Sequence, residues 1–358
     1  MSQGKQSPHY YGGQAVVEGV MMRGASTWAV AVRRPEGDIY LERHPVSDFS
    51  KRYPLFRKPM FRGMFGLIDA LRIGMKALTV SADQQLTEEE RARGNTLGAG
   101  SLAVALLMFV GIFIVLPNAG LALASNSLGD GVVYHLVEGV VRIAIFLGYL
   151  AAISLLADIR RVFAYHGAEH MTIAAWEHGE VLEPSSVRKY STLHVRCGTN
   201  FLLMVMLIAI ITYSAAGAVV PAPEGGAVVT TIYHVALRVL LLPVVAGLAY
   251  EGLRLGAGRD NVLVRAMMKP GLWLQMITTK PPTDDMIEVA VRSFEAVAPA
   301  DELAGNGQGP RIAGNLDSPL VWGPGQDRGP ATDNGQAGPS DVTGAPIGRP
   351  DEEPSAGF

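Results

Sequence analysis

Long stretches without a charged side chain constrain this chain more than any other feature. Residues 94–129 contain no Asp, Glu, Lys or Arg, and residues 197–223 contain none either. A helix needs about 20 apolar residues to cross the hydrocarbon core of a bilayer. Two more apolar stretches, 132–156 and 228–250, carry only a few charged or histidine side chains. The sequence therefore predicts four transmembrane helices.

Composition agrees with a membrane protein that also has soluble parts. Of the 358 residues, 49% are apolar and 18% are charged, whereas soluble domains have about 25% charged residues. The mean hydropathy is +0.22. The net charge of −3 gives no reason to expect nucleic acid as a partner. The single cysteine excludes an intramolecular disulfide and suits a reducing compartment.

The distribution of Lys and Arg predicts the orientation in the membrane. The loops 126–131 and 221–227 contain neither residue, whereas the N-terminal region, residues 158–199 and the segment after Tyr250 contain several. Basic residues favour the cytoplasmic side. We therefore expect a multi-pass protein of the bacterial cytoplasmic (inner) membrane, in contact with the lipid bilayer, with both termini cytoplasmic. A homo-oligomer is compatible with the sequence.

The N-terminal region has patterns of both strands and a helix. Residues 27–34 alternate between apolar and polar, and after a turn residues 39–43 do so again, which predicts a β-hairpin. From Pro59 to Val80 the period becomes helical. The apolar stripe of this helix, which includes Ile68, Leu71 and Met75, either rests on an anionic membrane surface or packs on the hairpin.

The expected fold class is mainly α, with four transmembrane helices, a small α+β cytoplasmic domain and a disordered C-terminal tail. The tail, from Pro299, is dominated by Gly, Pro, Asp, Asn and Ser and shows no period. The expected segments are a cytoplasmic N-terminal region (1–93), a first transmembrane hairpin (94–157), a cytoplasmic central loop (158–199), a second transmembrane hairpin (200–250), a cytoplasmic C-terminal segment (251–298) and the tail (299–358).

The central loop contains the order of residues H-x-x-E-H. His166 and His170 lie four residues apart, so on a helix they project from one face and can bind one metal ion. Glu169 between them is placed to act as a general base, as in the zinc peptidases that share this order. The alternative is a helix that carries polar residues where it leaves the membrane. We expect the second transmembrane helix to continue without a break into this motif.

Further ligands are expected at His194-x-x-Cys197, which has the spacing of a metal-binding pair. Three protein ligands and a water molecule would make a catalytic site, whereas four protein ligands would make a structural one. The sequence leaves both open. A third alternative needs no metal and uses Cys197 as a nucleophile with His194 or His170 as its base.

Two other groups of polar residues stand in apolar surroundings. Gln14, Glu18 and Arg23 lie in a glycine-rich apolar segment, which predicts either a buried polar cluster or a turn that leads into a strand. The second group lies within the predicted transmembrane helices, where such residues either join the bundle or serve transport. Its members are His135, Glu138, Arg142, His234 and Arg238.

Four segments together resemble the bacterial DUF1385 family, also called YqhQ-like. They are YGGQAVVEGVMMRG (11–24), YHGAEHMTIAAWE (165–177), HVRCGTNFLL (194–203) and PGLWLQMITT (270–279). The family is described as a group of predicted metal-dependent membrane enzymes, and the resemblance implies the same for this chain. Its motif positions include those already named and Arg196. Met171 departs from the family pattern, in which we expect a Lys at that position.

These observations predict a membrane-embedded, metal-dependent hydrolase, with peptidase-like chemistry. A divalent metal, zinc, would be bound by His166 and His170, with His194 or Cys197 completing the ligands and Glu169 as the base. The alternative is a non-enzymatic scaffold or adaptor with a structural metal site, and the third reading is a transporter. The sequence names neither the substrate nor a protein partner.

Overall fold

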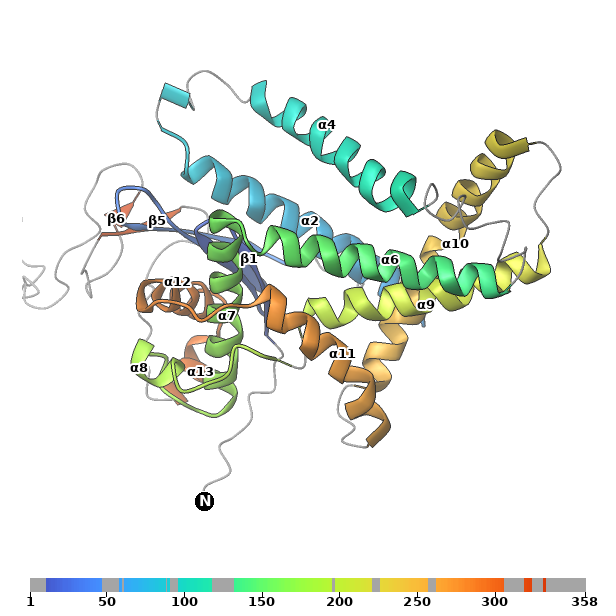
Figure 1. The fold of residues 1–358 in the computed structure, drawn as a ribbon. Coiled ribbons are helices and arrows are strands. Elements are labelled where there is room, and N and C mark those ends of the chain that lie inside the picture. The colour runs from blue at the N-terminus through green and yellow to red at the C-terminus, as the bar shows by residue number, and fades with distance from the viewer. Residues whose placement is uncertain are drawn as a thin grey trace, which may run out of the picture.

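The computed structural model describes a little over two thirds of the chain. The described residues are 11–46, 58–59, 61–87, 89–90, 96–117, 132–194, 197–220, 226–256, 262–305, 319–323 and 331–332, and the side chains of His135 and His234 lie outside this description. A β-sheet with helices on its faces forms one end of the molecule. Long apolar helices extend from it towards the other end (Figure 1).

The sheet has six strands in the order of the sequence, each antiparallel to the next. The predicted hairpin is confirmed, because Thr27 pairs with Pro45 at one end and Arg33 with Ile39 at the other. Gly37 in the turn of this hairpin has a φ of 92°. This conformation would be strained for any residue with a Cβ atom. The strands are β1 (Gly12–Val16), β2 (Gly19–Arg23), β3 (Thr27–Arg33), β4 (Ile39–Pro45), β5 (Leu320–Trp322) and β6 (Ala331–Thr332).

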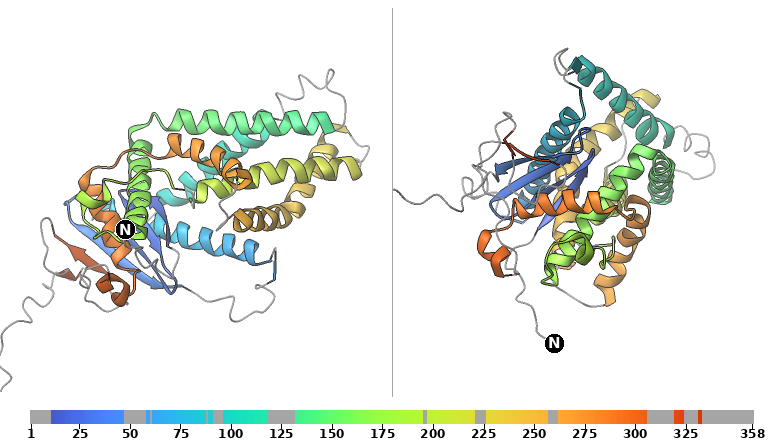
Figure 2. Two further views of the ribbon diagram at one scale, coloured as in Figure 1. Left: turned by 90° about the horizontal axis from the view of Figure 1, so that it is seen from below. Right: turned by 90° about the vertical axis from the view of Figure 1, so that its left-hand side faces the viewer.

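Helices cover both faces of the sheet because successive strand residues point to opposite sides. Ala29 and Ala31 face the core shared with α7 (Ala157–Glu177) and α12 (Asp284–Glu295). Trp28, Val30 and Val32 face α2 (Phe61–Gln84) instead. Figure 2 shows the sheet between these helices.

Helix α2 follows the predicted amphipathic segment, but of the predicted apolar stripe Met64, Ile68, Leu71, Met75 and Leu78 only Leu78 packs on the core between α2 and the sheet. Ile73 and Ala77 are buried against β3, so packing on the hairpin is confirmed. The stripe of Ile68, Leu71 and Met75 remains exposed. Its contact with a membrane surface stays a prediction.

Within the described part of the chain, three helices are long and apolar enough to cross a membrane: α6 (Val132–Ile153), α9 (Gly198–Val219) and α10 (Gly226–Gly256). They correspond to three of the four predicted spans. In the remaining one, α4 (Thr96–Val110) continues into a π-helical turn, η2 (Gly111–Val115), and its apolar part, Ala103–Phe113, is shorter than a span. Residues 118–129 of that stretch lie outside the described part of the chain.

The expectation of one continuous helix from the second span into the H-x-x-E-H motif is wrong. Helix α6 ends at Ile153, and Leu156 has an extended backbone (ψ 135°) just before α7 begins at Ala157. The chain therefore turns sharply, and α7 runs across the direction of α6 (Figure 1). The turn lays α7 against the sheet, where its apolar residues are buried.

The prediction of a wholly disordered tail is also wrong in part. Residues 300–305 form α13 (Ala300–Gly305), and β5 pairs with β4, which would otherwise be an edge strand. Leu303 and Leu320 are buried in the core shared with α7 and α12. The rest of the predicted tail lies outside the described residues apart from Pro299, 319–323 and 331–332. Helix α8 (Pro184–Val187) and helix α11 (Val262–Thr278), which packs on α9, complete the fold.

Candidate metal centre

Helix α7 presents the H-x-x-E-H motif at the junction of the sheet and the apolar helices. Gly167 lets the helix pass close to the end of the segment after α11, because a Cβ atom there would lie 2.2 Å from the carbonyl oxygen of Lys280. The backbone N–H of Lys280 also donates to the carbonyl of Phe163 (2.8 Å). These contacts hold the C-terminal end of α11 beside the motif.

Three ligand atoms converge at this place. The ligand atoms of His166, His170 and Cys197 all lie within 4.8 Å of one another. His166 Nε2 is 3.2 Å from Cys197 Sγ, and the two imidazole ring centroids are 4.4 Å apart. Two ligands at 2.0–2.3 Å from a zinc ion lie roughly 3.5 Å apart. The separation therefore suits one shared ion.

Backbone carbonyl groups orient both imidazoles. His166 Nδ1 lies 2.9 Å from the carbonyl oxygen of Thr278, and His170 Nδ1 lies 2.5 Å from that of Thr192. A carbonyl can only accept, so each Nδ1 carries the proton and each Nε2 presents its lone pair. This arrangement is the usual one around metal-binding histidines.

The Nε2 atom of His170 gives an independent indication of a ligand. The side chain is 1% exposed, and Nε2 is buried with no hydrogen-bond partner among the described residues. Burial, with His166 nearby, lowers the pKa of His170 to about 3, so the ring is neutral at physiological pH. A buried lone pair without a donor is costly, and a metal ion would satisfy it.

Cys197 enters the cluster from the start of an apolar helix long enough to cross a membrane. It caps the N-terminus of α9, and its sulfur accepts from the N–H (3.4 Å) and the hydroxyl (3.3 Å) of Thr199. Burial raises the pKa of the thiol, while these two donors counter the shift. Coordination to a metal would deprotonate the sulfur.

His194 does not join the three ligand atoms. Its Nε2 lies 3.5 Å from Oε2 of Glu177, and its ring centroid lies 5.7 Å from that of His170. Gln275 fixes the backbone of His194, accepting from its N–H (2.8 Å) and donating to its carbonyl (2.9 Å). His194 is therefore a neighbour of the cluster that faces a carboxylate.

The side chain of Glu169, on α7, is buried against the first strand, β1. Burial raises its pKa to about 8, and the nearby Cys197 adds to the shift. His166 and a hydrogen bond from the backbone N–H of Gly13 act in the opposite direction. A Cβ atom at Gly13 would lie 2.9 Å from the Glu169 side chain. Strand β1 thus supplies both the donor and the space for this carboxyl group.

The polar residues of the glycine-rich segment hold the sheet to its neighbours and do not form one cluster. Gln14 lies against Gly74 of α2, where a Cβ atom would be 2.4 Å from its Oε1. Arg23 pairs with Asp69 of α2 (2.7 Å). Arg196 lies outside the described residues.

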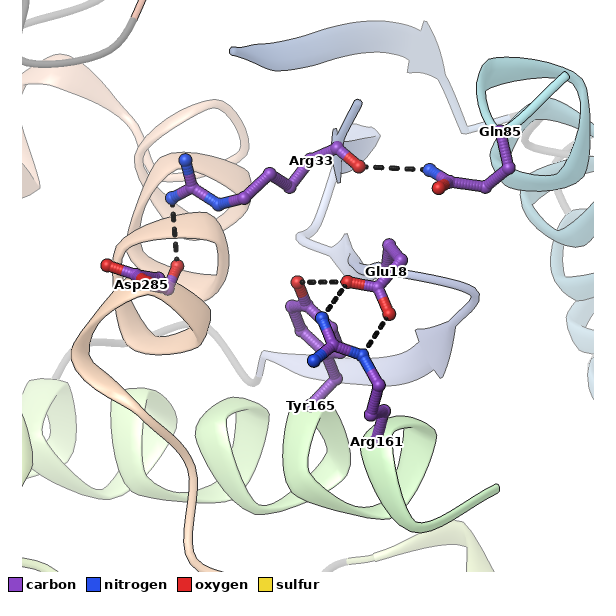
Figure 3. A network of polar contacts seen from close by, with 6 residues as sticks. All are labelled: Glu18, Arg33, Gln85, Arg161, Tyr165 and Asp285. Atoms are coloured by element: carbon purple, nitrogen blue, oxygen red, sulfur yellow. Dashed lines mark hydrogen bonds and ion pairs between the residues drawn. The ribbon is translucent and has the colours of Figure 1, made fainter. Parts of the chain in front are cut away.

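Glu18 lies in the turn between β1 and β2, with a φ of 50°. It accepts two hydrogen bonds of 2.5 Å from Arg161 and one of 3.3 Å from the hydroxyl of Tyr165, both on α7 (Figure 3). Nearby, Arg33 of β3 donates to the backbone carbonyl of Asp285 at the start of α12. The hairpin that carries Gly13 is therefore fastened to the helix that carries the histidines.

Comparisons with known proteins place the chain in a family. The family described as "Protein of unknown function (DUF1385)" matches residues 58–300. The chain belongs to the DUF1385 family. It is 32% identical over 317 residues to "Uncharacterized protein YqhQ" of Bacillus subtilis (strain 168), covering 85% of this chain and 96% of that protein. No solved structure matches.

Sequence reasoning did not find the groups that orient the ligands. The acceptors for the two imidazoles are the carbonyls of Thr192 and Thr278, and a backbone carbonyl leaves no signal in the residue type. A weak signal existed in Gln275, Thr278 and Thr279, which are polar residues near the end of an apolar helix. All three are buried.

Proposed function

We propose that this DUF1385 protein is a multi-pass membrane protein that binds a zinc ion through His166, His170 and Cys197. Two imidazole nitrogens and one thiolate are ligands that suit zinc. The observation that carries the proposal is the buried His170 Nε2, which is oriented by its Thr192 partner and lacks any hydrogen bond among the described residues.

We further propose that the site is hydrolytic, with peptidase-like chemistry. Three protein ligands leave one position for water, and a bound zinc ion lowers the pKa of that water towards neutrality. Glu169 is the base in this scheme, since it neighbours both ligand histidines on α7. Electrostatic interactions with His166 and Cys197 also shift its pKa. Gly13 holds the carboxyl group through its backbone N–H.

Metal content tests the site directly. Elemental mass spectrometry on detergent-purified protein should find one zinc per chain in the wild type and none in the double variant H166A/H170A. The matched control is H178A, which removes an exposed histidine at the end of the same helix. Wild-type protein without stoichiometric metal, or equal metal in both variants, would refute the site.

The role of Glu169 needs a second variant. E169Q should keep its zinc and lose the peptide hydrolysis of the wild type, because the amide cannot accept a proton from water. Retained hydrolysis would refute the assignment of the base. Loss of zinc in E169Q would mean that the carboxyl group holds the site together instead.

A structural metal site in a scaffold or adaptor is the second candidate. It is favoured by the position of the cluster, since two ligands come from α7 on the sheet and the third comes from the start of α9. In this case C197A should unfold the sheet region, with no hydrolysis in any variant. A stable, well-folded C197A protein would count against it.

The distance from Cys197 Sγ to His166 Nε2 (3.2 Å) also fits a nucleophile and its base. The sequence suggested His194 or His170 in that role, whereas the imidazole at hydrogen-bond distance from the sulfur is that of His166. Alkylation of Cys197 by iodoacetamide separates the two readings, because a bound metal should protect the thiol until a chelator is added.

We also propose the full arrangement in the membrane: a fourth span within residues 94–129, both termini and the central loop in the cytoplasm, and segment boundaries as predicted from the sequence. The charge-free stretch and the absence of Lys and Arg from two loops support this topology. Single cysteines introduced into C197A protein as S127C and A222C should react with an impermeant maleimide from outside. A cysteine introduced as S26C, at an exposed position between β2 and β3, should not.

A further inference from the structure

Helix α11 carries an exposed stripe that contains two large apolar side chains. Lys269, Trp273 and Met276 are spaced i, i+4 and i+7, so they share one face of the helix. Trp273 is 65% exposed and Met276 is 63% exposed. Lys280, two residues after the end of α11, continues the stripe, and its ammonium group lies 3.5 Å from the carbonyl oxygen of Met276. The two apolar side chains therefore lie between two lysines.

The opposite face of α11 is held by the fold. Gln275 is buried, and its amide makes the two hydrogen bonds to the backbone of His194 described above. Gly271 lies on α9, where a Cβ atom would be 2.6 Å from Cγ of Asn200. Helix α11 thus passes across the start of α9 (Figure 1). A rotation of α11 that buried Trp273 would break these contacts, so the stripe stays exposed.

The contact with Asn200 gives the depth of α11 relative to the apolar helices. The stretch of α9 that is long enough to cross a membrane begins at Gly198, and Asn200 is two residues inside it, about 3 Å at 1.5 Å per residue. The headgroup region is about 5–7 Å thick on each side of the hydrocarbon core. Trp273 is two residues from Gly271, so it lies near the boundary between hydrocarbon and headgroups whatever the tilt of α11.

We propose that α11 lies at the membrane surface, with Trp273 and Met276 in contact with lipid. An amphipathic helix binds there through its apolar face. Tryptophan is common at the boundary between membrane and water, because its ring is apolar and its N–H can still find a hydrogen-bond partner. Lysine side chains at the ends of an apolar stripe can extend to lipid phosphates, and they favour an anionic surface.

A second copy of the chain fits this face less well than lipid does. In a two-fold symmetric dimer the same surface is present on both sides of the contact. Because Lys269 and Lys280 stand at the two ends of the stripe, lysines would meet lysines whether the two helices ran parallel or antiparallel. Such contacts between like charges are unfavourable. Anionic lipid headgroups supply the opposite charge.

The position of α11 also fixes the depth of the proposed metal centre. Thr278, the last residue of α11, accepts from Nδ1 of His166 (2.9 Å), and Cys197 directly precedes the apolar stretch of α9. A helix docked on lipid therefore holds the three ligands at the membrane surface. This contact goes beyond the topology proposed above, which places residues 251–298 in the cytoplasm without assigning them a membrane contact. It does not depend on a bound zinc ion.

Tryptophan fluorescence measures what surrounds Trp273 in the full-length protein. The protein is placed in nanodiscs of phosphatidylcholine and phosphatidylglycerol, either unmodified or brominated on the acyl chains close to the headgroup, and iodide is added to the water. Bromine quenches indoles in contact with lipid, whereas iodide quenches those that water reaches. Each measurement is repeated with W273F. Trp28 and Trp176 are buried in the cores at the sheet, so they give the same background in both proteins.

We expect brominated lipid to remove on the order of a quarter of the wild-type emission, which is the share of one tryptophan in four, and to leave W273F unchanged. M276D should reduce this quenching about twofold or more, because it places a charge in the apolar stripe. The matched control M276L should keep it. If W273F does not fold, W273Y replaces it.

Two results for the wild type would overturn the proposal. Quenching of Trp273 by iodide with no effect of brominated lipid would place the stripe in water. Protection of Trp273 from both quenchers would mean that a second copy or another protein covers this face. Full quenching by brominated lipid in M276D would show that Met276 does not lie in lipid, and the proposed face of α11 would then be wrong.

Discussion

Gly167 lies where α7 packs closely on the segment after α11. Its substitution tests how tightly the imidazoles are held. In G167A the new methyl group would meet the Lys280 carbonyl oxygen at 2.2 Å, so the two segments must separate. Overpacking of this kind costs about 1–3 kcal/mol. It would also move His166 away from the Thr278 carbonyl that orients it.

We expect G167A to lower the melting temperature and the zinc content together. The control is G148A, since a Cβ atom at Gly148 meets nothing within 4 Å. Thermal unfolding and elemental analysis measure the two effects. Full zinc content in a destabilised G167A protein would mean that the second contact of His166 is dispensable.

Substitutions of Glu18 can separate the free-energy cost of its backbone conformation from the contribution of its side-chain contact. Its φ of 50° is unfavourable for any residue with a Cβ atom, by about 1 kcal/mol. Its contact with Arg161, whose side chain is 54% exposed, contributes at most about 1 kcal/mol. Both E18A and E18G lose the contact, but only glycine removes the backbone cost.

We therefore expect E18G to be more stable than E18A by about 1 kcal/mol, with R161Q close to E18A. Thermal or denaturant unfolding of the detergent-solubilised protein measures the difference. Equal stability of E18A and E18G would show that the turn relaxes when the contact to α7 is lost.

The ligand residues could be found from the sequence, but their grouping could not be settled. The i, i+4 spacing placed His166 and His170 on one face of a helix, and that face is where Cys197 arrives. His194 has an equally good spacing to Cys197, yet it faces Glu177. The choice depends on how the loop is fixed by Gln275, 81 residues away in the sequence, and no local pattern contains that contact.

At the scale of elements, the segment after Ala298 gives a prediction that composition alone would not. Leu303 and Leu320 are buried in the core, and β5 covers the edge of β4. Burial of a leucine side chain is worth about 1.5–3 kcal/mol. A chain truncated after Ala298 should therefore be less stable by several kcal/mol than a chain truncated after Thr332, which keeps both leucines and β5.

Thermal unfolding of the two truncated proteins beside the full chain checks this expectation. The bond from the Tyr11 hydroxyl to Glu302 (2.8 Å) would also be lost in the shorter protein only. Equal stability of all three proteins would mean that α13 and β5 are not held in place.

The elements that could be predicted well from the sequence are those with a long, uniform pattern of apolar and polar residues. Helices α6, α9 and α10 come from apolar stretches of about 20 residues, and the β3–β4 hairpin comes from strict alternation. Strand β5 has three residues in a region of polar composition, so its burial depends on a partner strand far away in the sequence. The break before α7 falls in an apolar run around Leu156, where helix and turn have similar composition.

At the scale of the whole molecule, the proposed metal centre joins two bodies. Helix α7 belongs to the core under the sheet, and α9 is one of the helices long enough to span a membrane. The histidines come from the first and Cys197 from the second. A bound ion therefore adds its binding free energy to the attachment of the sheet to the bundle, and removal of the ion should loosen that attachment.

A chelator makes this a measurable prediction. Zinc present at a thousand times its dissociation constant stabilises the folded protein by about 4 kcal/mol, so chelation should lower the melting temperature by several degrees. Trp176, which lies on α7 and is buried in the core, reports the transition through its fluorescence. In C197A, which lacks the ligand from α9, the chelator should have little effect, whereas H178A should respond like the wild type. An equal shift in wild type and C197A would place the stabilising ion elsewhere, and the attachment would then rest on direct contacts such as that between His194 and Gln275.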